Sequence, residues 1–292
     1  MAGLFWYDGA WSSEEPKLLG PMDHAMWQGS VIFDGARGIH GWAPDLDRHC
    51  ARAVRSALAM GMKPTKTAEE IEALAREAVG RMGPEAEVYI RPMFFIRRAI
   101  GSSQPDPDST DFLLAVYDAP LPGFTGFSAM MTPFRRPTPD MAPTGAKAAC
   151  LYPNSQRAAG WARSQGADNA VLCDAVGNVA EFATSNIWFA KDGVVVTPAP
   201  NQTFLNGITR QRIMKLLREA GVTVEERSVA PEELESADEI FSTGNFAKVQ
   251  PVIRYNGRDL QPGPFALKAR ELYFAWMKAQ PRVAAPAAVA AE

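Results

Sequence analysis

The sequence has little cysteine and little histidine, and this scarcity excludes several kinds of site. Its 292 residues include three cysteines, Cys50, Cys150 and Cys173, and three histidines. The cysteines are odd in number and lack the paired spacing of metal ligands. We therefore expect small buried thiols in a reducing compartment, with no disulfide and no structural zinc. The histidines are too isolated in the sequence to suggest a metal site.

The sequence also lacks a long apolar run and a basic cluster. No segment approaches about 18 consecutive apolar residues, and the N-terminus has no basic flank followed by an apolar stretch. Lys and Arg together number 30 against 33 Asp and Glu, which gives a net charge of -3 and no basic field for a nucleic acid. We expect a cytoplasmic protein that binds neither membranes nor nucleic acids.

The apolar content, 47%, is sufficient for the cores of one large or two medium domains. The spacing of apolar residues predicts an α+β fold with a small N-terminal domain and a larger C-terminal domain of mixed α/β type. A segment rich in Pro and Gly separates them. The predicted boundaries are 1–118 for the first domain, 119–126 for the linker, 127–280 for the second domain and 281–292 for a disordered tail.

Local patterns predict the main elements of each domain. In the first, Thr67 and Glu70 form a capping box at the start of a helix, and a turn is expected at Asp8 and Gly9 within a strand over 4–11. Further predicted elements are a helix near 46–58, strands at 87–96 and 111–118, helices at 155–163, 208–220 and 264–278, a hairpin near 169–182, and strands at 185–190, 222–227, 239–243 and 248–254.

Lys147 is the first candidate for chemistry. It lies in GAKAACLY (145–152), where small neighbours leave room for a planar cofactor, although an exposed loop lysine explains the same pattern. Tyr152 follows five residues later, and Glu181 lies on a predicted strand. A carboxylate against a pyridine nitrogen keeps that nitrogen protonated, so that the ring accepts electrons from a carbanion. This combination indicates a Schiff base with pyridoxal phosphate.

The segment 206–210 supplies a candidate phosphate site. Asn206 is predicted to cap a helix whose first N–H groups, at Ile208 and Thr209, point toward an anion, and the Thr209 hydroxyl adds a donor. An ordinary capped surface helix is the alternative. An arginine from the helix at 46–58 is expected to complete a dianion site: Arg52 is the first candidate, and Arg48 and Arg55 are the alternatives.

Seven segments in this order resemble the fold type IV pyridoxal-phosphate enzymes, and among them the branched-chain amino acid aminotransferases. They are MDHAMWQGSVIFDGARGI, LDRHCARAVRSA, VYIRP, AKAACLYPNS, VAEFATSNIW, VVVTPAPNQTFLNGITRQRI and ADEIFSTGNFAKVQPV. The resemblance implies the two-domain fold of that group and a homodimer or dimer-based oligomer. It also implies ping-pong transamination of branched-chain or related apolar L-amino acids, through a lysine aldimine, with 2-oxoglutarate as acceptor.

The resemblance also implies roles for individual residues. Lys147 forms the aldimine and moves the proton, and Glu181 pairs with the ring nitrogen. The other cofactor contacts implied are Tyr152 on the ring oxygen, Leu205 on the ring face, and Arg52, Ile208, Thr209 and Asn245 on the phosphate. Tyr89 and Arg91 match positions that receive substrate carboxylates, and the remaining candidates for the substrate pocket are Phe33, Gln28, Phe246 and Arg97.

Three positions depart from the pattern and leave the substrate open. Asn245 stands where the family commonly has Thr, Gln28 where the branched-chain enzymes tend to have an aromatic residue, and Arg97 begins a loop that in relatives reaches a neighbouring subunit's site. The alternatives on the same fold are a D-amino acid transaminase, an (R)-amine transaminase and an aminodeoxychorismate lyase. A non-catalytic binding protein that retains the fold is an alternative of another class.

Overall fold

The computed structural model describes residues 3–283, which its contacts group into two compact units. Unit 1 contains residues 3–121, 146–150 and 277–283, and unit 2 contains residues 122–145 and 151–276. Segment 146–150, which the sequence analysis assigned to the second domain, thus groups with the first. Of the predicted tail, Val283 donates its N–H to the Gly41 carbonyl at 2.7 Å, and residues 284–292 lie outside the described residues.

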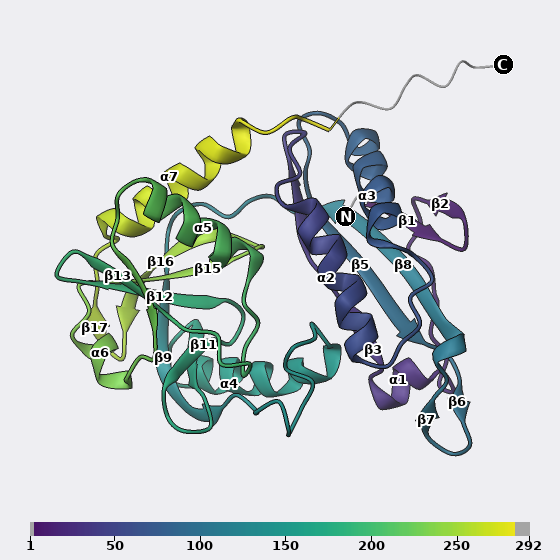
Figure 1. Cartoon of the computed structure of the whole chain (residues 1–292), viewed down its shortest axis with the longest axis horizontal. Helices are drawn as coiled ribbons and strands as arrows, with labels where there is room; N and C mark the ends of the chain where they lie inside the picture. The colour runs from purple at the N-terminus through teal and green to yellow at the C-terminus, as the bar shows by residue number, and fades with distance from the viewer. Residues whose placement is uncertain (1–2, 284–292) are drawn as a thin grey trace. The chain divides into compact units, whose positions relative to one another are not determined.

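Unit 1 is an antiparallel sheet with two long helices (Figure 1). The sheet has the strand order β2-β1-β8-β5-β3, and β4 also pairs with β5. Its elements are β1 (Gly3–Tyr7), β2 (Ala10–Ser12), α1 (His24–Gln28), β3 (Val31–Phe33), β4 (Ala36–Ile39), α2 (Leu46–Ala59), α3 (Ala68–Met82), β5 (Glu87–Ile96), a small hairpin of β6 (Ala99–Ile100) and β7 (Gln104–Pro105), the 3₁₀ turn η1 (Pro107–Ser109) and β8 (Thr110–Asp118).

Local sequence accounts for the elements of unit 1. The predicted capping box is confirmed: the Glu70 N–H donates to the Thr67 hydroxyl at 3.2 Å, and the Thr67 N–H donates to the Glu70 carboxylate at 2.7 Å. The predicted turn is confirmed as well. Asp8 and Gly9 have φ of 49° and 84°, so the expected strand over 4–11 folds back on itself as β1 and β2.

Unit 2 is a nine-stranded mixed sheet covered by helices. The strand order is β11-β10-β9-β16-β15-β12-β13-β14, with β17 beside β16, and β9 is parallel to both of its neighbours. The elements are β9 (Phe127–Arg135), α4 (Tyr152–Ser164), β10 (Asn169–Cys173), β11 (Val179–Phe182), β12 (Asn186–Lys191), β13 (Val194–Pro198), α5 (Ile208–Glu219), β14 (Val224–Arg227), α6 (Pro231–Glu235), β15 (Glu239–Gly244), β16 (Lys248–Tyr255), β17 (Arg258–Asp259) and α7 (Pro264–Lys278).

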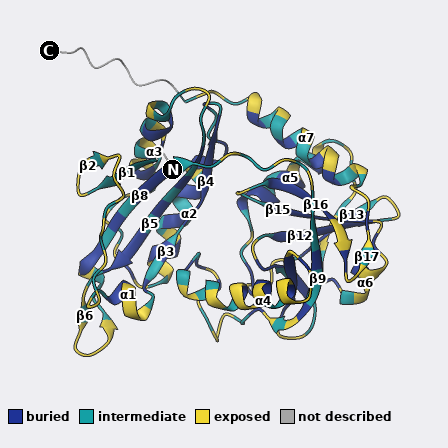
Figure 2. Cartoon of the chain, turned by 180° about the vertical axis from the view of Figure 1, so that it is seen from behind, coloured by how far each residue is buried: buried dark blue, intermediate teal, exposed yellow. Residues whose placement is uncertain are grey.

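The core of unit 2 fixes the position of α5 on the sheet. Ile213 and Leu217 of α5 pack against Trp188 and Phe241 of the sheet, in a cluster that includes Tyr273 of α7. Strands β10, β12, β13 and β15 are almost wholly buried, whereas β14 and β17 are partly exposed (Figure 2). Because burial of each large apolar side chain contributes about 1.5–3 kcal/mol, these contacts hold α5 firmly on the sheet.

The start of one helix and the burial of one cysteine differ from the sequence predictions. Helix α4 begins at Tyr152, three residues earlier than predicted. Cys50 and Cys173 are buried as expected, but Cys150 is exposed in the 3₁₀ turn η2 (Ala149–Leu151). Within residues 3–283 no helix is both long enough and apolar enough to cross a membrane.

Candidate active site

Lys147 is held by unit 1 as a short extension of its sheet. Ala148 makes an isolated antiparallel bridge with Ile32 of β3, and the Lys147 N–H donates to the Ser56 hydroxyl of α2 at 3.0 Å. The neighbouring alanines are fully buried whereas Lys147 is half-buried. Its ammonium lies 4.9 Å from the centre of the Phe33 ring. The backbone of this lysine is therefore fixed, and its amine lies beside an aromatic side chain of β3.

Tyr89 and Arg91 share one face of β5. They are half-buried and alternate with the fully buried Val88 and Ile90, as expected from strand periodicity. Burial raises the pKa of Tyr89, whereas the positive charges of Lys147 and Arg91 act to lower it, so its hydroxyl lies within electrostatic reach of Lys147. These contacts group three of the predicted site residues within unit 1.

Tyr117 of β8, which the sequence analysis missed, holds the Arg91 side chain. The two guanidinium–ring distances are 5.2 Å to Tyr117 and 5.4 Å to Tyr89, and an Arg91 NH2 group donates to the Tyr117 hydroxyl. The Arg91 Nε is buried and has no hydrogen-bond partner among the described residues. Such a donor is costly to leave unsatisfied, which is typical of a site that receives an anion.

Tyr89 also requires a glycine. A Cβ placed on Gly35 would lie 1.9 Å from the Tyr89 hydroxyl. Since Cβ atoms do not approach other atoms this closely, Gly35 leaves the space that the phenol occupies. The motif FDGARG thus includes a glycine with a steric reason for its position.

Arg52 is paired with a buried carboxylate rather than exposed on its helix. Its Nε donates to Asp34 at 2.6 Å and one NH2 group at 2.9 Å, and His49 contacts the same carboxylate at 2.7 Å. Burial alone raises the pKa of Asp34, but Arg52 and His49 outweigh it and hold this pKa below its usual range. Of the two alternative arginines, Arg55 is exposed and Arg48 contacts Asp45.

Of the two further candidates in unit 1, Gln28 lies at the surface and Arg97 is bound to other side chains. Gln28 is exposed at the end of α1. The Arg97 guanidinium donates to Asp111 at 3.1 Å, to Tyr7 at 2.7 Å and to a backbone carbonyl. These contacts fix Arg97 within its own unit, and any contact with substrate stays a prediction.

In unit 2, Glu181 is held by two side chains that the sequence analysis missed. The Arg136 Nε lies 3.3 Å from one carboxylate oxygen, and the Asn186 amide donates to the other at 3.3 Å. Both partners are buried, and Arg136 is itself fixed by the Ser155 hydroxyl. The orientation of the Glu181 carboxylate is therefore set by the core of unit 2.

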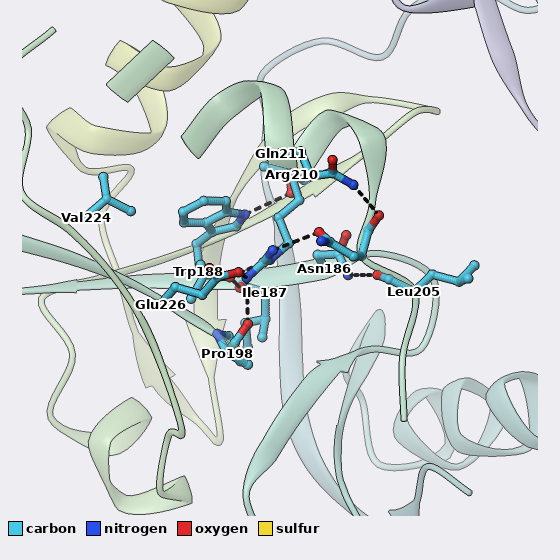
Figure 3. Close-up of polar contacts among 12 residues, drawn as sticks. Asn186, Ile187, Trp188, Pro198, Leu205, Arg210, Gln211, Val224 and Glu226 are labelled. Carbon is cyan, nitrogen blue, oxygen red and sulfur yellow. Dashed lines mark hydrogen bonds and ion pairs between the residues drawn. The ribbon is translucent and has the colours of Figure 1, made fainter. Parts of the chain in front are cut away.

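The same asparagine reaches the first turn of α5. Its amide also donates to the Leu205 carbonyl at 2.9 Å (Figure 3), and its Oδ1 would lie 2.1 Å from a Cβ on Gly207, which immediately precedes α5. Asn186 thus connects the Glu181 carboxylate with the loop that carries Leu205 and with the start of the helix. Ile208 and Thr209, both buried, begin that helix.

Arg210 braces the start of α5, and the predicted role of Asn206 is wrong. The fully buried Arg210 donates to Asn206 at 2.9 Å, Thr197 at 3.1 Å, the Pro198 carbonyl at 2.7 Å and Glu226 at 2.7 Å (Figure 3). Because the Asn206 oxygen accepts from Arg210, it does not cap the helix, and Gly207 is the N-cap residue without a side-chain cap. An uncapped first turn keeps its N–H groups available to an anion.

The remaining candidates of unit 2 lie at element boundaries. Tyr152 is the first residue of α4, and Asn245 and Phe246 form the turn between β15 and β16. Phe246 is exposed, whereas the Asn245 Nδ2 is buried and has no hydrogen-bond partner among the described residues. A buried donor of this kind is a second feature that fits an anion.

Comparison with known proteins identifies the family of this chain. Residues 31–255 match the model of the family described as amino-transferase class IV. The chain belongs to this family. An aminotransferase structure from Brucella abortus, bound to the cofactor PLP, is 48% identical, with a TM-score of 0.94 over 96% of this chain and 100% of that one. The likeness of the class IV chain to such structures confirms the predicted fold type.

Two further relatives of this class IV aminotransferase are described as branched-chain enzymes. A branched-chain aminotransferase from Thermoproteus uzoniensis, solved with norvaline, is 32% identical with a TM-score of 0.86 over 94% of each chain. A probable branched-chain-amino-acid aminotransferase from Aquifex aeolicus is 32% identical over 279 residues, covering 89% of this chain and 88% of the relative. The resemblance read from seven segments is thereby confirmed.

Two of the residues that the sequence analysis missed, Asn186 and Arg210, could have been found from the sequence. The asparagine opens an apolar strand in SNIWFA, and the arginine lies on the buried face of α5 beside Ile213 and Leu217. A polar residue at such a position is usually paired in the folded protein. Tyr117, Arg136 and Asp34 have no comparable signal, because their partners are distant in the sequence.

Proposed function

We propose that this class IV aminotransferase uses pyridoxal phosphate to transfer the amino group between a branched-chain or related apolar L-amino acid and 2-oxoglutarate, by a ping-pong mechanism. The observation that carries the proposal is the grouping in unit 1 of an amine, Lys147, with a carboxylate receptor, Tyr89 and Arg91. The dicarboxylate pair, 2-oxoglutarate and glutamate, needs both: a group that exchanges protons at its Cα and a cation for its second carboxylate.

The described residues fit the cofactor. The Asn245 Nδ2 and the uncapped first turn of α5 supply donors for a phosphate, and the Glu181 carboxylate, fixed by Asn186, supplies an acceptor for a ring N–H. When bound, pyridoxal phosphate supplies an aldehyde that links to amines and a ring that withdraws electrons from the substrate Cα. The presence of PLP in the Brucella abortus structure supports the assignment.

Lys147 has two tasks in this proposal. Its amine would hold the cofactor in the resting protein and, once free, would take a proton from the substrate Cα and return one. The fixed backbone of segment 146–150 limits the Nζ to a small volume beside Phe33. Such positioning accelerates a proton transfer by reducing its entropic cost.

Arg91 supports the choice of a dicarboxylate as the second substrate. Its buried Nε is an open donor, and Tyr117 and Tyr89 fix the plane of the guanidinium. An arginine in this state favours a carboxylate over an apolar group. The norvaline in the Thermoproteus uzoniensis structure supports an apolar L-amino acid as the other substrate. The D-amino acid, (R)-amine and lyase alternatives have no comparable support.

A homodimer is part of the proposal. Four large apolar side chains of unit 1 are exposed at α1 and the β6–β7 hairpin: Met22, Met26, Trp27 and Ile100. The His24 ring ties these two segments together through the Ser103 carbonyl at 2.8 Å. Apolar exposure of this kind is typical of a subunit interface. The cytoplasmic location stays a prediction from the sequence.

The proposed function is tested by locating the bound cofactor. Borohydride reduction of the holoprotein should leave a pyridoxyl group on Lys147, and Lys147→Ala should lose both this tag and transamination by about 10³-fold or more. Lys215→Met is the matched control, since this lysine is exposed on α5 and paired with Glu219. Retained turnover in Lys147→Ala, or a tag on another residue, would refute the proposal. A panel of L-donors, D-donors and chiral amines with 2-oxoglutarate or pyruvate then defines the substrates.

A further inference from the structure

The turn between β15 and β16 places a lysine where glycine is usual. Gly244 pairs with Lys248 across a three-residue turn, and Lys248 has a φ of 64°. Hairpins of this length commonly end with a residue in the left-handed conformation, which glycine adopts without cost. A side chain there costs roughly 1–2 kcal/mol. An unusual residue at such a position suggests a role that compensates for the strain.

Lys248 is also buried. It is 1% exposed, its ammonium lies 5.3 Å from the centre of the Tyr273 ring, and it donates to the Asn245 Oδ1 at 2.6 Å. Removing an ammonium from water costs several kcal/mol, so a buried lysine is retained only with close partners. The short contact with Asn245 is a charge-assisted hydrogen bond, the strong kind. The Asn245 side chain is therefore fixed by its neighbour three residues away.

This contact decides which way the Asn245 amide points. A lysine ammonium has three donors and no acceptor, so only the oxygen of the amide can face it. The Nδ2 group must point elsewhere, and it is buried without a partner among the described residues. A buried donor left unsatisfied costs about 1–3 kcal/mol. The turn is thus arranged to present one N–H₂ group to a ligand that accepts hydrogen bonds.

The position of the β15–β16 turn within unit 2 indicates which ligand would accept this hydrogen bond. Thr243, two residues before Asn245, pairs with Asn186 of β12, and the Asn186 Oδ1 touches Gly207 at the start of α5. The β15–β16 turn and the uncapped N-terminus of α5 therefore lie near the same end of strands β12 and β15. Arg270 of α7 holds the turn through the Ala247 and Val249 carbonyls, at 3.3 and 3.1 Å.

We propose that Lys248 is a positioning residue, which orients the Asn245 amide so that its Nδ2 donates to the phosphate of the cofactor. This inference rests on the proposed function, because it takes pyridoxal phosphate as the ligand. Lys248 itself does not touch the phosphate. Its removal frees the amide to rotate, and the donor is then presented only part of the time.

The test compares binding of pyridoxal phosphate and of pyridoxal, which lacks the phosphate, to the apoprotein by absorbance titration. Lys248→Met should raise the Kd for pyridoxal phosphate about 10-fold and change the Kd for pyridoxal less than about 2-fold. The same substitution in an Asn245→Thr background should change either Kd less than about 2-fold, because a threonine hydroxyl rotates to donate without a lysine. Lys215→Met controls for loss of a lysine charge from unit 2.

A second variant keeps the test decisive if Lys248→Met does not fold. Asn245→Asp retains an acceptor for Lys248 and removes the donor, and it should weaken pyridoxal phosphate by about 10-fold or more without affecting pyridoxal. The inference would be overturned if Lys248→Met raised the Kd of both ligands equally. It would also be overturned if Lys248→Met still raised the Kd for pyridoxal phosphate about 10-fold in the Asn245→Thr background, or if Asn245→Asp left that Kd unchanged. A wild-type protein that takes no pyridoxyl group on Lys147 would instead overturn the proposed function.

Discussion

Arg210 in unit 2 and Arg91 in unit 1 both carry a guanidinium group inside the protein, and they differ in how its donors are used. Each of the three Arg210 nitrogens donates to a partner within unit 2. Arg91 donates to Tyr117 and lies close to two tyrosine rings, but its Nε has no partner among residues 3–283. A guanidinium with all nitrogens engaged stabilises the fold, whereas one with an open buried donor is suited to bind a ligand.

The comparison extends to the neighbourhoods of the two arginines. In unit 2, Arg210 and Asn186 connect strands, a loop and the first turn of α5, so the candidate phosphate and ring contacts form one braced assembly. In unit 1, Lys147 and Arg91 are half-buried side chains on a fixed backbone. The candidate residues of unit 2 are therefore braced by side-chain contacts, whereas Lys147 of unit 1 is fixed chiefly through its backbone.

Arg210→Met should produce the largest effect. The change leaves Glu226 and three other acceptors without their buried donor, and removing the buried member of such an ion pair costs about 3–5 kcal/mol. We expect a loss of about 4 kcal/mol in the free energy of unfolding, measured by urea denaturation with Trp fluorescence. Arg210→Lys, which keeps the charge but not the planar fork, should lose less. Unchanged stability with lost activity would contradict the assignment of Arg210 as a brace.

Asp34→Asn should produce the next effect, because unit 1 also contains a guanidinium, that of Arg52, bound to a buried carboxylate. The carboxylate holds both Arg52 and His49, and its removal should cost about 3 kcal/mol at neutral pH. Since the pKa of Asp34 is lowered in the folded state, its contribution is present above the unfolded pKa of about 4 and is lost as the pH falls further.

Urea unfolding of the wild type and of Asp34→Asn at several pH values tests this sign. The stability difference between the two proteins should be constant from about pH 5 to 7 and should narrow as the pH falls below about 4. A difference that grows in acid would mean that His49 rather than Asp34 governs the local charge. Glu77→Gln, at the exposed ion pair with Arg81 on α3, is the control expected to cost less than about 1 kcal/mol.

The sequence predicted those features that depend on local pattern. The capping box at Thr67 and Glu70 and the helix Pro264–Lys278 follow from spacing within one turn or one face. The family resemblance likewise depended on contiguous segments, and the matched range 31–255 includes nearly all of them. Local patterns in the sequence were therefore sufficient to predict the fold type and the candidate lysine.

Contacts between distant residues explain what the sequence could not predict. Arg136 and Glu181 are 45 positions apart, and Arg91 reaches Tyr117 on a neighbouring strand. The predicted Asn206 cap failed for the same reason: Arg210, braced by β13 and β14, competes for its oxygen. Side chains at element ends have several possible partners, and only the assembled sheet decides among them.

Arg91→Gln gives the smallest but most specific test of the comparison. Loss of one charge-assisted hydrogen bond costs about 1.5–3 kcal/mol, so the KM for 2-oxoglutarate should rise about 30-fold. The half-reaction with leucine and the free energy of unfolding should stay nearly unchanged. Tyr117→Phe should raise the same KM about 3-fold, because the guanidinium loses a fixed partner but keeps its charge. A stability loss in Arg91→Gln as large as that in Arg210→Met would show that both arginines are braces, and that substrate carboxylates bind elsewhere.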